Sequence, residues 1–188
     1  MWCVIPSSNG SSARIMSDRM VDVDIRSQSH LWQDALADPA GTVSAAARSA
    51  CAALGDRGDV AGELCVVLAD NAFVQQLNKD YRGKDQPTNV LSFPSPDIHR
   101  IVEPSHLGDI VLAFEMIAGE ADQANLPLEN HTAHLVVHGV LHLFGYDHVS
   151  AGDATQMESL EAKILSGLGI EDPYTDRPIT SGSEVSYG

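Results

Sequence analysis

The stretch HTAHLVVHGVLHLFGYDH, from His131 to His148, carries five of the eight histidines of this 188-residue chain. The residues between these histidines are mostly Leu and Val, which is typical of a buried helix. We predict a helix over residues 128–144, with Pro127 suited to its first turn and Gly145 to its end. Burying several imidazoles without a partner would cost free energy. We therefore expect the histidines to share a binding partner.

This spacing favours a metal ion as the shared partner. His138 and His142 are four residues apart, which places them about 40° apart around a helix and about 6 Å along it. Gly145 then ends the helix, so His148 can turn back toward the same point. Three neutral nitrogens suit Zn²⁺, and three protein ligands leave the fourth position open, as in catalytic zinc sites. We predict one zinc ion per chain, although nickel or copper also binds imidazole.

The neighbouring polar residues leave alternatives open. His134 lies one turn before His138 and is a candidate for a fourth ligand, a proton shuttle or a hydrogen-bonding neighbour of the site; a polar residue merely packed there is an equal alternative. Asp147 would either orient a ligand imidazole or stabilise the turn. His131 is expected to be exposed. The zinc-protease motif H-E-x-x-H has a Glu directly after its first His, and Gly139 in that position disfavours a peptidase.

Composition excludes several classes of protein. A net charge of -15 works against general binding to nucleic acid, so any RNA site must be locally basic. No segment approaches the ~20 apolar residues of a membrane span, and the first fifteen residues do not resemble a signal peptide. We therefore expect a cytoplasmic location and no membrane partner. Cys3, Cys51 and Cys65 are odd in number and scattered, which indicates reduced thiols.

The order of the patterns predicts one α+β domain over residues 20–170, with about four strands in a mixed sheet, helices packed on it and a zincin-like, histidine-rich helix. Residues 1–19 are expected to be a disordered extension and residues 171–188 a flexible tail. In the last strand Gly108 marks a bulge or a close approach. The expected strands are 20–25, 63–70, 88–94 and 106–114, and the expected helices are 30–36, 41–55, 70–83, 115–125, 128–144 and 151–169.

A basic cluster interrupts the acidic chain. The stretch LNKDYRGKDQPTNVLSFP, from Leu77 to Pro94, places Lys79, Arg82 and Lys84 within six residues, in a chain with 11 Lys and Arg in total. The planar guanidinium of Arg matches phosphate oxygens. We predict that these three residues bind substrate, with a solvated loop as the plain alternative.

Together, the segments HGVLHLFGYDH, LNKDYRGKDQPTNVLSFP and LGDIVL resemble the bacterial YbeY family, zinc-dependent endoribonucleases that mature ribosomal RNA. The order and separation of the motifs agree, and the resemblance spans residues 20–169. It implies that His138, His142 and His148 bind zinc and that Arg82 is the essential basic residue of the cleft. It also implies single-strand-specific cleavage in 3′-end maturation of small-subunit (16S) ribosomal RNA, ribosome quality control, and the small ribosomal subunit with its proteins as partner.

The working hypothesis is zinc-assisted hydrolysis of an RNA phosphodiester, in which Arg82 stabilises the charge that grows on the phosphate. The general base stays open between His134 and Asp147, and the ribose 2′-OH could replace water as nucleophile. One alternative is a zinc hydrolase of peptides or small molecules. The other is a non-enzymatic ribosome assembly factor with a structural zinc, which would need a fourth protein ligand such as His134.

Overall fold

The computed structural model describes residues 21–54, 62–96, 98 and 106–175. Cys3, the expected extension over residues 1–19 and most of the expected tail lie outside the described residues. Within them, ten elements follow one another: β1 (Val21–Ser27), α1 (Leu31–Ala35), α2 (Pro39–Ala53), β2 (Gly62–Ala69), α3 (Asn71–Arg82), β3 (Val90–Pro94), β4 (His106–Ala113), α4 (Phe114–Gln123), α5 (Leu128–Leu143) and α6 (Ala151–Gly167).

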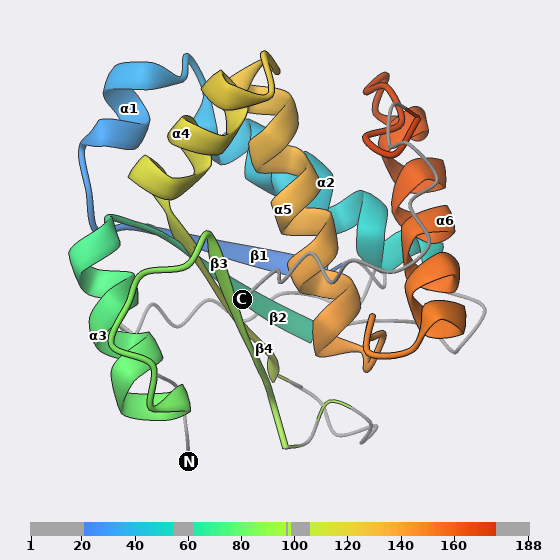
Figure 1. The fold of residues 1–188 in the computed structure, drawn as a ribbon, viewed down its shortest axis with the longest axis horizontal. Coiled ribbons are helices and arrows are strands. Elements are labelled where there is room, and N and C mark those ends of the chain that lie inside the picture. Colours follow the sequence, from blue (N-terminus) through green and yellow to red (C-terminus); the bar gives the residue numbers. More distant parts are fainter. Residues whose placement is uncertain (1–20, 55–61, 97, 99–105, 176–188) are drawn as a thin grey trace, which may run out of the picture.

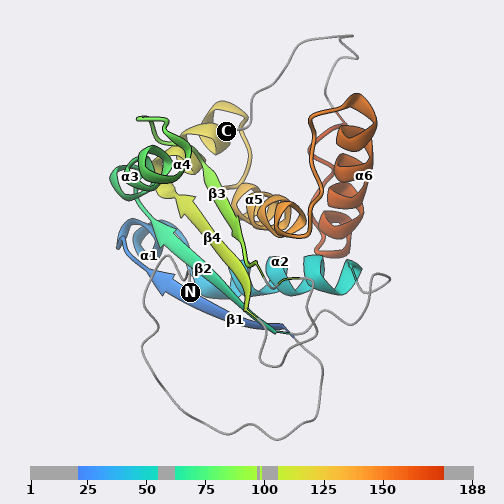
Figure 2. The ribbon, with the colours of Figure 1, turned by 90° about the horizontal axis from the view of Figure 1, so that it is seen from below.

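The four strands form one mixed sheet in the order β1-β2-β4-β3, which confirms the predicted fold class. β1, β2 and β4 are parallel, and the edge strand β3 runs antiparallel to β4. Helices α2 and α5 cover one face, α6 lies outside α5, and α3 lies on the opposite face (Figures 1 and 2). β2 is buried from Leu64 to Ala69 because it is central and covered on both sides.

Two apolar clusters hold these layers together. The larger one lies between the sheet and helices α2 and α5, and it includes Val43, Ala46, Leu64, Leu112, Val136, Val140 and Leu141. The smaller one lies between the sheet and α3, and it comprises Cys65, Val67, Ala69, Val74, Leu91, Val111 and Ala113. The core side of α5 is thus fixed by packing, and the direction of its histidines follows from it.

Gly108 allows β3, β4 and the end of α5 to approach one another. The register between β2 and β4 shifts here, so that Leu64 pairs with Gly108 while Glu63 pairs with His106. A Cβ at Gly108 would lie 2.5 Å from the carbonyl oxygen of Phe93 and 2.9 Å from Leu143, and its φ is +147°. The predicted bulge and the predicted close approach are therefore both present.

The helix ends follow local sequence signals. Asp70 accepts a hydrogen bond from the backbone N–H of Phe73 at 2.9 Å, and α3 stops before Gly83, as predicted. α2 begins two residues earlier than expected, because Asp38 caps it and Pro39 occupies its first position.

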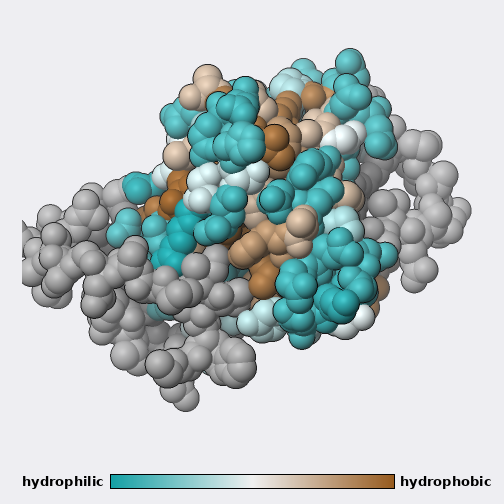
Figure 3. All heavy atoms as spheres, turned by 90° about the vertical axis from the view of Figure 1, so that its left-hand side faces the viewer, coloured by the Kyte–Doolittle hydropathy of each residue, from teal (hydrophilic) through white to brown (hydrophobic). Residues whose placement is uncertain are grey.

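The remaining expectations concern the thiols and the surface. Cys51 and Cys65 are buried thiols that form no disulfide within the described part of the chain, which confirms the prediction for these two residues. No helix in the described part of the chain is both long and apolar enough to cross a membrane. On the face shown in Figure 3, hydrophilic side chains cover much of the coloured surface, with small apolar patches between them.

Candidate metal centre

Three histidines meet at the end of α5. His138 and His142 lie one turn apart on the helix, and Gly145, with φ +81°, lets the chain turn back so that His148 joins them. One ring nitrogen from each lies within 4.8 Å of the others. The predicted convergence of the three imidazoles is confirmed.

The arrangement of the ring nitrogens fits a bound cation. The Nε2 atoms of His138 and His142 are 3.0 Å apart. Two nitrogens that bind one zinc at tetrahedral angles lie about 3.4 Å apart, so little adjustment is needed. Desolvation, followed by repulsion from His138 and His148, lowers the pKa of His142 to about 4. His142 is therefore neutral near pH 7, the form that binds metal.

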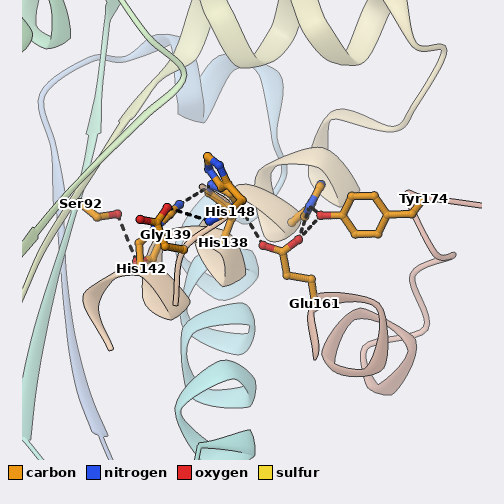
Figure 4. Close-up of polar contacts among 9 residues, drawn as sticks. Ser92, His138, Gly139, His142, His148, Glu161 and Tyr174 are labelled. Atoms are coloured by element: carbon orange, nitrogen blue, oxygen red, sulfur yellow. Dashed lines mark hydrogen bonds and ion pairs between the residues drawn. The ribbon is translucent and has the colours of Figure 1, made fainter. Parts of the chain in front are cut away.

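A buried carboxylate orients His138. Glu161 of α6 is fully buried, and its Oε1 lies 2.8 Å from Nδ1 of His138 (Figure 4). If Nδ1–H donates to this carboxylate, the lone pair of His138 is left on Nε2, toward the other two rings. Desolvation raises the pKa of Glu161, but hydrogen bonds from His134 and His138 outweigh it and lower this pKa to about 2. The carboxylate is thus an anion beside the imidazole of His138.

His134 lies outside the group of three. Its Nε2 is 3.1 Å from the hydroxyl oxygen of Tyr174 and 3.4 Å from Oε2 of Glu161. Of the alternatives left open by the sequence, this geometry favours a hydrogen-bonding neighbour of the site over a fourth ligand.

Asp147 and His131 also have defined positions. The Oδ1 of Asp147 accepts a hydrogen bond from the backbone N–H of His148 at 2.7 Å, which stabilises the turn. The expectation that His131 is exposed is wrong, because its side chain is only 10% exposed and its Nε2 lies 2.8 Å from Glu120.

The three histidines open onto a cavity of about 290 Å³. Arg82, the last residue of α3, also lines this cavity. Desolvation lowers the pKa of Arg82 from its ordinary value, but a guanidinium stays charged in proteins. Lys79 instead pairs with Asp85 at 2.7 Å, and neither Lys79 nor Lys84 lines the cavity. The lining residues are Arg82, Val90, Ser92, His138, His142, Asp147 and His148.

Gly139 packs against the sheet and leaves no room for a protease carboxylate. A Cβ at this position would lie 3.1 Å from Oγ of Ser92 and 3.1 Å from Ile110. The hydroxyl of Ser92 donates to the carbonyl oxygen of Gly139 at 3.1 Å, which joins β3 to α5 beside the histidines. The Cβ of a Glu here would require α5 or these neighbours to move by a few tenths of an ångström.

Sequence reasoning missed two residues beside the histidines. Glu161 does carry a signal, since it falls on the stripe formed by Met157, Ile164 and Leu165, where an apolar residue is expected. Tyr174 carries no such signal, because it lies in a Pro- and Thr-containing segment that resembles a tail.

Comparisons with known proteins agree with the motifs. The sequence profile described as Endoribonuclease YbeY matches residues 28–169. Two relatives with that name come from Paramagnetospirillum magneticum (49% identity, 78% of this chain and 91% of that protein) and Azorhizobium caulinodans (44% identity, 82% and 96%). A third, from Parvibaculum lavamentivorans, is 43% identical over 92% of this chain and 98% of its own length. The solution structure of TM1509 from Thermotoga maritima aligns with 87% of this chain at 21% identity and a TM-score of 0.47.

Proposed function

This chain belongs to the YbeY family, and on that premise we propose that it is a metal-dependent endoribonuclease that processes ribosomal RNA. One observation carries the proposal: three imidazole nitrogens within 4.8 Å of one another line the same cavity as a guanidinium. A cation and an arginine that line the same cavity suit an anionic phosphodiester.

We assign the metal to His138, His142 and His148, and we expect it to be zinc. A divalent cation held there would supply Lewis-acid stabilisation of charge on the phosphate and would activate water. Glu161 keeps the Nε2 lone pair of His138 turned toward the cluster. Among the described residues, three nitrogen donors face an open cavity. This arrangement supports a catalytic metal site over a closed structural one.

Arg82 is the residue that we assign to the scissile phosphate. Its planar guanidinium can hold two phosphate oxygens and stabilise the negative charge that develops on them. Lys84 and Lys79 would act from outside the cavity, through the local electrostatic field. The charge of Lys79 is already partly balanced by Asp85, so we expect it to contribute less.

Asp147 is better placed than His134 to accept a proton from the nucleophile. Asp147 lines the cavity, whereas the Nε2 of His134 faces Tyr174 and Glu161. Either water or a ribose 2′-OH can serve as the nucleophile in this arrangement.

We further propose single-stranded RNA as the substrate, with 3′-end maturation of 16S ribosomal RNA and ribosome quality control as the setting. The acidic chain, with a net charge of -15, would bind free RNA weakly and with strong dependence on salt. A small ribosomal subunit with its proteins would then deliver the RNA, in the cytoplasm.

A cleavage assay on a single-stranded RNA oligonucleotide tests the proposal. We expect Arg82→Ala to lower kcat/KM by about 10²–10³-fold, the effect of removing one transition-state donor, without loss of bound zinc. Arg48→Ala is the matched control, because Arg48 is exposed on α2 and does not line the cavity.

A second variant serves as a control for contamination, and two outcomes of the assay would contradict the proposal. His142→Ala protein purified in the same way must lose activity, which excludes a contaminating nuclease. Wild-type cleavage rates in the Arg82→Ala protein, or cleavage of casein with no effect on RNA, would overturn the assignment.

A further inference from the structure

The chain continues past α6 and returns to the metal centre. Ile170 donates its N–H to the carbonyl oxygen of Leu165 at 3.0 Å. A turn follows, in which Oδ1 of Asp172 accepts a hydrogen bond from the N–H of Tyr174 at 2.9 Å. This turn holds Tyr174 against α5 and α6, beyond the residues 28–169 that match the family.

The hydroxyl of Tyr174 completes the hydrogen bonding of a buried carboxylate. It donates to Oε2 of Glu161 (Figure 4). Its oxygen lies 3.1 Å from Nε2 of His134, and the two rings meet edge to face at 5.8 Å. The other oxygen of Glu161 faces Nδ1 of His138 at 2.8 Å. A continuous polar chain therefore runs from the segment after α6 to the first histidine ligand.

We propose that Tyr174 is a positioning residue of the metal centre: its hydroxyl fixes the Glu161 carboxylate, which in turn holds His138 with Nε2 toward the cluster. The inference rests on the proposed metal site and not on the RNA reaction. In this protein a segment outside the family match thereby contributes to metal affinity.

Burial explains why one hydroxyl matters. Glu161 has 0% exposure, so water cannot replace a lost donor, and a buried oxygen without its partner is costly. With Tyr174→Phe the carboxylate keeps His138 on Oε1 and the longer contact with His134 on Oε2, at 3.4 Å, but it loses the hydroxyl donor on Oε2. The carboxylate then rotates to a position set by His138 and His134 alone. As a result, the imidazole of His138 is held less firmly in its orientation.

Zinc affinity, measured by competition with a chromophoric chelator, tests the proposal on the full chain. We expect Tyr174→Phe to weaken zinc binding by about three- to tenfold, the factor of a single hydrogen bond, and Glu161→Gln to weaken it by about 10–100-fold. Thr175→Val is the matched control, since the Thr175 hydroxyl donates to the backbone carbonyl oxygen of Asp172, three residues earlier, and not to Glu161. The visible spectrum of the Co²⁺-loaded protein should shift with Tyr174→Phe and not with Thr175→Val.

The double variant separates positioning from general packing. If Tyr174 acts through Glu161, then Tyr174→Phe changes zinc affinity much less in the Glu161→Gln background than in the wild type. An equal effect in both backgrounds, or unchanged zinc affinity in Tyr174→Phe, would overturn the inference. A wild-type protein that takes up neither Zn²⁺ nor Co²⁺ would overturn the metal site itself, and the inference with it.

Discussion

Gly139→Ala tests the contact that holds the histidine helix on the sheet. The added methyl group would lie 3.1 Å from Oγ of Ser92 and 3.1–3.2 Å from two side-chain carbons of Ile110. Ile110 has 0% exposure, so it cannot swing into solvent. α5 must therefore move away from β3 and β4 by a few tenths of an ångström, and His138 moves with it.

The size of the effect follows from two opposing contributions to the free energy of unfolding. Replacing a helical glycine by alanine stabilises by about 0.5–1 kcal/mol, whereas overpacking a core costs about 1–3 kcal/mol. We expect a net destabilisation of about 1–2 kcal/mol, or about 2–8 °C in Tm for a domain of this size. Gly119→Ala in α4, where the methyl group meets nothing within 4 Å, should instead raise Tm by about 1–4 °C.

Thermal unfolding in EDTA measures both variants without a contribution from metal. The opposite signs of the two shifts are the decisive result, because both substitutions make the same change in helix propensity. A Gly139→Ala protein as stable as the Gly119→Ala protein would refute the tight helix–sheet contact. Repeating the measurement with zinc shows whether the displacement of His138 also weakens metal binding.

The remaining predictions address the metal, a thiol and a carboxylate. Zinc in 1,000-fold excess over its dissociation constant should stabilise the fold by about 4 kcal/mol, measured as a rise in Tm, and His148→Ala should abolish most of that rise. Burial raises the pKa of the Cys51 thiol to about 12, and Cys65 is buried as well, so a Cys3→Ser protein should show no reaction with Ellman's reagent until denaturant is added. Desolvation raises the pKa of Glu120, but hydrogen bonds from His131 and Asn89 outweigh it and leave this pKa below its ordinary 4.5. The stability due to its charge is thus present above pH 4.5 and lost as the pH falls through the folded value. Urea unfolding should accordingly show that the deficit of Glu120→Gln at pH 7 shrinks toward pH 3; a constant deficit would contradict the sign.

The sequence was sufficient for the elements and for the meeting of the histidines. Periodicity and end signals such as Asp70 are local, so helix and strand limits could be predicted to within about two residues. The histidine cluster could be predicted equally well, because two of its histidines share a helix face and the third follows the Gly145 turn. A site assembled from one continuous segment needs no knowledge of the tertiary fold.

What could not be predicted depends on contacts between distant segments. His131 was expected to be exposed because its own helix gives no hint of Glu120, which α4 brings to 2.8 Å. Glu161 and Tyr174 reach the site only because α6 and the turn after it pack against α5.

The same contacts make the metal centre cooperative with the fold. His138 and His142 belong to α5, whereas His148 lies in the connection between α5 and α6, and Glu161 belongs to α6. A cation bound by all three histidines would fix this connection, and a fixed connection holds α6 where Glu161 meets His138 at 2.8 Å. Metal binding and the packing of α6 should therefore reinforce each other, because each restrains the segment that the other requires.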